Sequence, residues 1–239
     1  MSAVKTIMQA ALRPRHPVRA LSEGTGAISP PAAGGTAAIS PPVDTDIEPI
    51  LANLKRFDTT FLVDDSASMN GPRWRLAREA LTAVVDRAIR YDTNGVDIRF
   101  FNDKDHRGDN LTTARQVIHL FDRVQPDGVT PMEDAIDDEL NEYMVRYKEG
   151  GRATKKLNLI VLTDGEPNLD DNVEEMIVRY AEELDRERAK ANQIGIQFVQ
   201  IGDDRKAGAF LKMLDDDLKP KHGLKRDVCS FTVLRWVGV

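Results

Sequence analysis

The most constraining feature of this sequence is the alternation of short apolar runs with longer segments of helical periodicity. Apolar runs of strand length occur at 57–63, 96–102, 156–165, 194–202 and 227–239. Segments whose apolar residues recur every three or four positions lie at 73–91, 111–124, 133–148, 174–191 and 207–218. Strands that are separated by helices of this length predict βαβ units and a mostly parallel sheet.

Two of the apolar runs are nearly continuous in apolar character. They are LIVL at 159–162 and FVQIG at 198–202. Strands that are covered by helices on both faces have this pattern. We therefore expect an α/β fold with a doubly wound, mostly parallel, Rossmann-like sheet flanked by helices. Ligands of such sheets bind outside the carboxyl ends of the strands, at the point where the strand order reverses.

The N-terminal part of the chain has a different composition from the rest. Residues 23–45 read EGTGAISPPAAGGTAAISPPVDT and consist mainly of Gly, Ala, Ser and Pro. Such a segment buries too little surface to offset the entropy lost on ordering, so we expect a disordered, low-complexity tail over 1–45. The folded domain is assigned to 46–239, and the helical spacing of apolar residues at 47–54 predicts a lead-in helix.

Composition and charge exclude several classes of protein. The chain has 239 residues, a formal net charge of -6 and one cysteine, Cys229. The negative charge argues against a nucleic-acid binder, and the single cysteine excludes a multi-cysteine zinc site. No apolar run approaches the ~18 residues that a membrane span needs. A reducing, cytoplasmic compartment is the simplest interpretation. Residues 1–22 are basic and lack acidic side chains, which leaves mitochondrial targeting as the alternative.

Polar side chains gather where the expected strands end. Asp64, Ser66 and Ser68 follow the first strand in the stretch FLVDDSAS, and Asp164 follows LIVLT. Thr130 lies in a third polar loop, DGVTP, which precedes a helix. Because the carboxyl ends of parallel strands share one edge of the sheet, these side chains can converge. All of them offer oxygen ligands, which predicts a site for Mg²⁺, or for Mn²⁺ or Ca²⁺.

At these residues the sequence resembles the von Willebrand factor type A (vWA) family. The metal ion-dependent adhesion site of that family combines a D-x-S-x-S motif with a distant Thr and a distant Asp, which match Asp64-Asp65-Ser66-Ala67-Ser68, Thr130 and Asp164. The resemblance implies metal-dependent binding of a protein partner through its acidic side chain, without catalysis. It also implies that Ser66 and Ser68 coordinate the ion directly, that Thr130 does so directly or through water, and that Asp64 and Asp164 act mainly through water.

The chain departs from the family pattern near its end. The family domain usually continues past its sixth strand into a last helix, and Leu234 to Val239 has no amphipathic helical pattern. This leaves the completeness of that edge open and does not affect the metal motif.

Simpler structural roles exist for the same residues. Asp and Ser are common helix N-caps, and the helix at 73–91 begins close to Ser68. Thr130 followed by Pro131 is a good capping sequence, with the threonine as N-cap. Acidic loop residues such as Asp65 and Asp103 are interpreted as solvated rather than as a ring around the site.

Two enzymatic alternatives compete with a binding module. A Mg²⁺-dependent hydrolase or phosphotransferase of the phospho-aspartate type would need a carboxylate two positions after its nucleophile, where Ser66 stands. A serine hydrolase would need the G-x-S-x-G turn, which the serines at 66 and 68 lack. The sequence therefore favours a binding module, with the metal-dependent α/β enzyme as the alternative.

Overall fold

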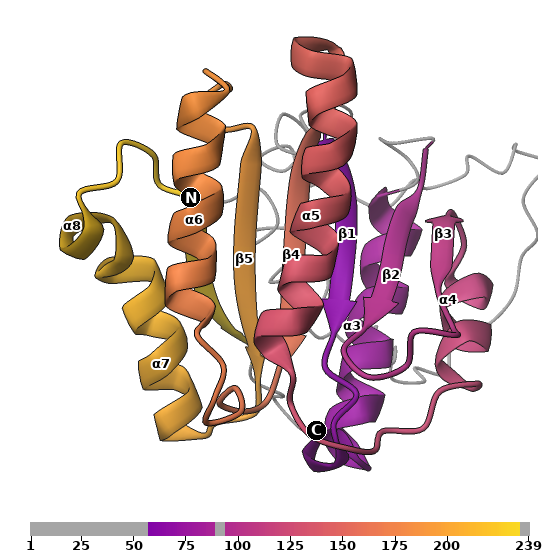
Figure 1. Cartoon of the computed structure of the whole chain (residues 1–239). Coiled ribbons are helices and arrows are strands. Elements are labelled where there is room, and N and C mark those ends of the chain that lie inside the picture. The colour runs from indigo at the N-terminus through magenta and orange to yellow at the C-terminus, as the bar shows by residue number, and fades with distance from the viewer. Residues whose placement is uncertain (1–56, 89–93, 235–239) are drawn as a thin grey trace, which may run out of the picture.

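The computed structural model describes residues 57–88 and 94–234 (Figure 1). The strands are β1 (Phe57–Val63), β2 (Val96–Phe100), β3 (Gly108–Leu111), β4 (Lys156–Thr163), β5 (Ile194–Ile201) and β6 (Cys229–Leu234). The helices are α3 (Pro72–Ala88), α4 (Ala114–Phe121), α5 (Met132–Gly150), α6 (Val173–Arg186), α7 (Arg205–Asp216) and α8 (Leu218–His222). Two short 3-10 helices, η1 (Ala67–Met69) and η2 (Gly151–Ala153), complete the described elements.

The six strands form one sheet in the order β3-β2-β1-β4-β5-β6. β1, β2, β4, β5 and β6 pair in parallel, and β3 is antiparallel to β2 at the edge. The chain winds from β1 outward to β3, and then returns to the other side of β1 and winds outward to β6. The strand order therefore reverses between β1 and β4, and the crevice at their carboxyl ends is the expected ligand position of a doubly wound sheet.

Both faces of the sheet carry a hydrophobic core. Alternate residues of a strand point to opposite faces, so Phe61 packs with one core and Leu62 with the other. Helices α3 and α4 cover the face of Phe61, and α5, α6, α7 and α8 cover the face of Leu62. In Figure 1, α5 and α6 lie in front of the sheet and α3 lies behind it. This double cover explains the near-continuous apolar character of β4 and β5.

The α/β, doubly wound fold class is confirmed, and so are the five expected strands. Two helices were predicted too long and β3 was not predicted: the helix expected at 174–191 ends at Arg186. The helix expected at 111–124 is shorter, α4, and Leu111 belongs instead to β3. β3 has the polar sequence GDNL, and only its first and last residues are buried. Such a short, exposed edge strand is held by backbone pairing rather than by an apolar face, so it leaves no hydrophobic pattern to find.

Other expectations concern residues outside the described ranges. They are the disordered tail at 1–45, the lead-in helix at 47–54 and the chain end at 235–239, and the structure says nothing about them. Within the described residues, no helix is long and apolar enough to cross a membrane.

Candidate functional site

The loop after β1 begins with a carboxylate that is completely buried. Asp64 is 0% exposed, and its backbone N–H donates to the carbonyl of Leu162 in β4 at 2.8 Å. One carboxylate oxygen, Oδ1, accepts the backbone N–H of Ser66 at 2.9 Å. The other, Oδ2, accepts the hydroxyl of Thr163 at 2.6 Å. Asp64 therefore lies at the junction of the two strands between which the strand order reverses.

The two serines connect Asp64 to the loop after β4. Ser66 Oγ and Ser68 Oγ are 3.1 Å apart, and Ser68 Oγ donates to Asp164 Oδ1 at 2.8 Å. Because Ser68 gives its single hydroxyl proton to Asp164, Ser66 is the donor in the bond between the serines. Ser66 and Asp164 are buried, whereas Ser68 is exposed. Of these oxygen atoms, the hydroxyl of Ser68 is the one on an exposed residue.

Burial and hydrogen bonding shift the pKa of Asp64 in opposite directions. Burial raises the pKa of Asp64 above its ordinary value, and the hydrogen bonds from Ser66 and Thr163 lower it. The negative charge of Asp164 adds to the rise in the pKa. In the absence of a cation, the ionised form of Asp64 is therefore costly, and a positive charge close by would relieve that cost.

The loop at 127–131, which carries Thr130, reaches the same edge of the sheet through backbone hydrogen bonds. The Gly128 carbonyl accepts from Ala67 N–H at 3.1 Å, and Asp127 N–H donates to the Asp65 carbonyl at 2.8 Å. Thr130 follows two residues after Gly128 and is half-buried. Its loop therefore packs against the D-x-S-x-S loop, but its hydroxyl is not part of the hydrogen-bonded chain that joins Asp64, the serines and Asp164.

Thr130 does not cap α5, and this corrects the capping interpretation. The N-cap of α5 is Pro131, which makes no side-chain capping bond. The backbone of Thr130 is instead bonded to Asn168: its N–H donates to Asn168 Oδ1 at 3.1 Å, and its carbonyl accepts from Asn168 N–H at 3.2 Å. These two bonds join the loop before α5 to the loop after β4.

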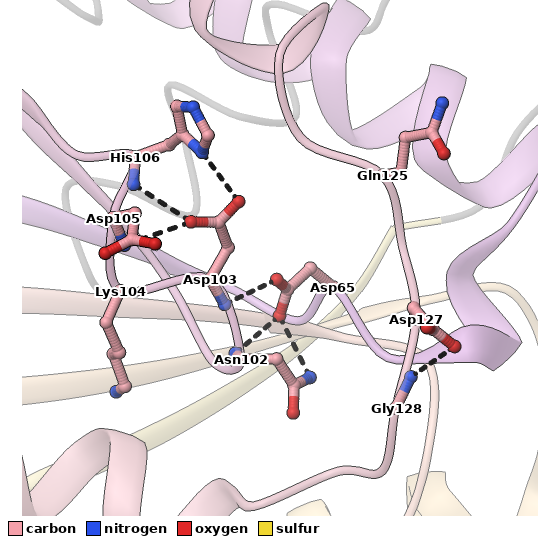
Figure 2. Close-up of a pocket in the computed structure, with 9 residues that line it drawn as sticks. All are labelled: Asp65, Asn102, Asp103, Lys104, Asp105, His106, Gln125, Asp127 and Gly128. Atoms are coloured by element: carbon pink, nitrogen blue, oxygen red, sulfur yellow. Dashed lines mark hydrogen bonds and ion pairs between the residues drawn. The ribbon is translucent and has the colours of Figure 1, made fainter.

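Asp65 has a structural role that differs from the solvated loop residue expected from sequence. It is 1% exposed, and Figure 2 shows its carboxylate directed at the loop after β2. Oδ1 accepts the backbone N–H and the side-chain amide of Asn102, at 2.7 and 3.1 Å, and Oδ2 accepts the N–H of Asp103 at 2.9 Å. Asp65 thereby fixes the D-x-S-x-S loop to its neighbour, which leaves Asp64 as the residue facing β4.

A polar pocket adjoins the candidate site on the side of Asp65 (Figure 2). His106 lies there with its Nδ1 2.8 Å from Asp103 Oδ2, so its contact is with a carboxylate and not with the serines. Within the described residues, no group of three or more His, Cys, Asp and Glu side chains could hold a metal ion. Any cation at the candidate site would therefore depend on the serine and threonine hydroxyls beside the two carboxylates.

Two residues of the site were missed from sequence, Thr163 and Arg73. Thr163 is 0% exposed and holds Asp64, and a buried threonine at the end of an apolar run was the available signal. Arg73 forms an ion pair with Asp164, with Nη1 2.6 Å from Oδ2. Nothing in the sequence indicates that pairing, because 91 positions separate the two residues and only the fold joins them.

Comparison with known families agrees with the fold. The model of the von Willebrand factor type A domain matches residues 58–222, which is more than half of the chain. A comparison with curated proteins gave no match. Domains of the matched family commonly mediate protein–protein interaction. The chain therefore belongs to the von Willebrand factor type A domain family.

Proposed function

We propose that this domain binds a protein partner through a divalent cation held by Asp64, Ser66, Ser68, Thr130 and Asp164. Mg²⁺ is the first candidate, with Mn²⁺ or Ca²⁺ as alternatives, because all of these residues offer oxygen. The observation that carries the proposal is a hydrogen-bonded set at the strand-order reversal, in which Asp64 accepts the backbone N–H of Ser66 and the hydroxyls of Ser66 and Ser68 lead to Asp164. The partner would supply an acidic side chain.

The spacing of the oxygen atoms suits a small octahedral ion. With Mg–O bonds of about 2.1 Å, neighbouring ligand oxygens of an octahedron lie about 3 Å apart. The Ser66 Oγ to Ser68 Oγ distance is 3.1 Å, and the Ser68 Oγ to Asp164 Oδ1 distance is 2.8 Å. These two distances are also ordinary hydrogen-bond lengths, and they support the proposal in that they are compatible with neighbouring oxygen ligands of one ion.

Each residue has a distinct task in this proposal. Ser68 directs its proton at Asp164 and accepts from Ser66, which leaves one oxygen lone pair of the exposed hydroxyl free for a cation. Asp64 fixes Ser66 through the backbone N–H and supplies a buried negative charge. A bound dication would supply compensating positive charge and an exchangeable coordination position. The partner's carboxylate would take that position.

The rim beside Thr130 supports a macromolecular partner. Val129 is 63% exposed and Leu169 is fully exposed, although both are large apolar side chains. The bonds between Thr130 and Asn168 hold their two loops together. Exposed apolar side chains beside a charged centre are typical of binding surfaces, where burial of apolar area adds affinity to a polar contact.

The contacts of the serines favour binding over nucleophilic catalysis. A serine nucleophile needs a general base within hydrogen-bond reach. In the described part of the chain, the side-chain partners of Ser68 are Ser66 and Asp164, and Asp164 is itself ion-paired with Arg73. A generic ester or phosphoester that is hydrolysed by wild type but not by Ser66→Ala would contradict the binding proposal.

The cation is tested by thermal and urea unfolding in EDTA and in increasing Mg²⁺ or Mn²⁺. Ligand binding to the native state raises the free energy of unfolding by about 2.7 kcal/mol at a concentration of 100 times Kd. We expect this rise for wild type and not for the double variant Ser66→Ala, Ser68→Ala. Ser230→Ala, in β6, is the matched control and should respond as wild type does. An equal rise in the double variant would count against the site.

The partner is tested by capture on the immobilised domain with Mg²⁺ and with EDTA. We expect a partner that is retained in Mg²⁺ and lost both on chelation and with the double serine variant. The variant Val129→Ser, Leu169→Ser should weaken capture while it leaves the metal-dependent stabilisation unchanged. Capture that persists in EDTA would show that the interaction does not pass through the cation.

A further inference from the structure

Arg73 lies in the first turn of α3 and contacts the candidate site directly. Its Nη1 is 2.6 Å from Asp164 Oδ2 and donates to the Ser68 carbonyl at 3.0 Å. The guanidinium thus contacts two residues that the proposed function assigns to the cation. Its side chain is 42% exposed, whereas that of Asp164 is 2% exposed. The buried member of the pair is therefore the carboxylate, and the partly exposed member is the arginine.

The position of Arg73 is unfavourable for α3 itself. The amino end of a helix carries partial positive charge, so a cation in the first turn is disfavoured. The first turn of α3 contains no acidic side chain that would compensate for it. The compensation comes from Asp164, which belongs to the loop after β4. Arg73 is thus better explained by the charge of the site than by the stability of its own helix.

We infer that Arg73 is a tethered counter-cation, which neutralises Asp164 in the metal-free domain and competes with the dication for that carboxylate. This inference rests on the proposed function. An arginine and a dication that share one carboxylate repel each other, so metal binding requires Arg73 to release Oδ2. Its partial exposure allows the guanidinium to move into solvent. Arg73 therefore lowers the metal affinity of the site and stabilises the site without metal.

The test compares wild type with Arg73→Gln, which removes the charge but keeps a polar chain. Arg75→Gln is the matched control, because Arg75 is an exposed arginine two positions along α3. Calorimetric titration with Mg²⁺ and Mn²⁺ gives the affinity. We expect Arg73→Gln to bind about fivefold more tightly than wild type, a factor that corresponds to the loss of about 1 kcal/mol of ion-pair interaction from a partly exposed arginine. The gain should shrink at high salt, and Arg75→Gln should bind as wild type does.

A second measurement uses no metal. In EDTA, Arg73→Gln should unfold at a lower urea concentration than wild type, because Asp164 loses its counter-charge. The loss should disappear when Arg73→Gln is combined with Asp164→Asn, since the pair interaction is then already absent. A loss of the same size in both backgrounds would overturn the counter-ion role.

The outcomes separate this inference from the proposed function. If wild type binds the metal and Arg73→Gln binds it equally or more weakly, the competition is refuted while the metal site stands. If only Arg73→Gln binds the metal, the competition is supported in its strongest form. If neither binds at millimolar Mg²⁺ or Mn²⁺, both the metal site and the competition for it are refuted.

Discussion

Replacement of Thr163 by valine tests the electrostatics of the site without touching a residue proposed to bind the cation. Valine has nearly the shape of threonine, so Thr163→Val leaves no cavity in β4. It removes the hydroxyl that donates to Asp64 Oδ2 at 2.6 Å, and both residues are 0% exposed. A hydrogen bond to a charged group contributes about 1.5–3 kcal/mol. We expect Thr163→Val to lower the free energy of unfolding in EDTA by about 2 kcal/mol at a pH above the raised pKa of Asp64.

The loss of unfolding free energy in Thr163→Val should change with pH in a definite direction. Burial raises the pKa of Asp64, so the folded domain holds this proton more tightly than the unfolded chain does. The protonated group therefore favours folding at low pH, and this contribution is lost as the pH rises through the raised pKa. The Thr163 hydroxyl favours the ionised form and opposes that loss. The cost of Thr163→Val should be largest above the raised pKa of Asp64 and should shrink as the pH falls below it.

Urea unfolding in EDTA at several pH values measures both effects. Thr232→Val is the matched control, because Thr232 is a buried threonine of β6 whose hydroxyl accepts a long bond of 3.4 Å from the neutral Gln197 side chain. We expect a cost below about 1 kcal/mol there, with no such pH dependence. A cost for Thr163→Val below about 0.5 kcal/mol, or one that is constant with pH, would refute the assignment of a buried, hydrogen-bonded charge at Asp64.

Two further predictions concern the scaffold. Gly95 has φ +79°, and a Cβ there would lie 2.7 Å from the backbone of Asn110 and Leu111. Gly95→Ala should therefore lower the free energy of unfolding by more than about 2 kcal/mol, whereas Gly195→Ala, with no atom within 4 Å of the added Cβ, should cost much less. Asp185→Asn should lower the free energy of unfolding by about 3 kcal/mol, because it removes the carboxylate that pairs with the guanidinium of Arg226. Arg226 is only 5% exposed. Arg226→Met, which removes the charge, should cost less. Urea unfolding measures the free energy of unfolding of all four variants. Equal losses for the two glycine variants, or for Asp185→Asn and Arg226→Met, would contradict the corresponding prediction.

Much of the fold was predictable because its strands and helices carry local patterns. The runs that became β1, β4 and β5 are apolar because helices cover both faces of the sheet, and the amphipathic segments became α3, α5 and α6. β3 could not be predicted, because its sequence GDNL has no apolar face and its structure comes from pairing with β2. An element that is held only by its neighbour leaves little trace in its own residues.

The candidate site was likewise predicted only in part from the sequence. Asp64, Ser66, Ser68 and Asp164 were predicted to converge because strand ends meet at one edge, and the structure brings them into one hydrogen-bonded chain. The loop that carries Thr130 packs against the D-x-S-x-S loop as expected, but Thr130 does not cap α5. Metal binding by any of these residues stays a prediction.

The sequence alone determined the kind of molecule: an α/β sheet with oxygen-bearing side chains at the carboxyl ends of two central strands. It could do so because periodicity and strand-end chemistry are properties of consecutive residues. The tertiary structure decided how the charges at that edge are balanced. Thr163 and Arg73 are far in sequence from the carboxylates that they contact, at Asp64 and Asp164. Burial and counter-charge depend on neighbours in space, and the order of residues does not reveal them until the sheet has formed.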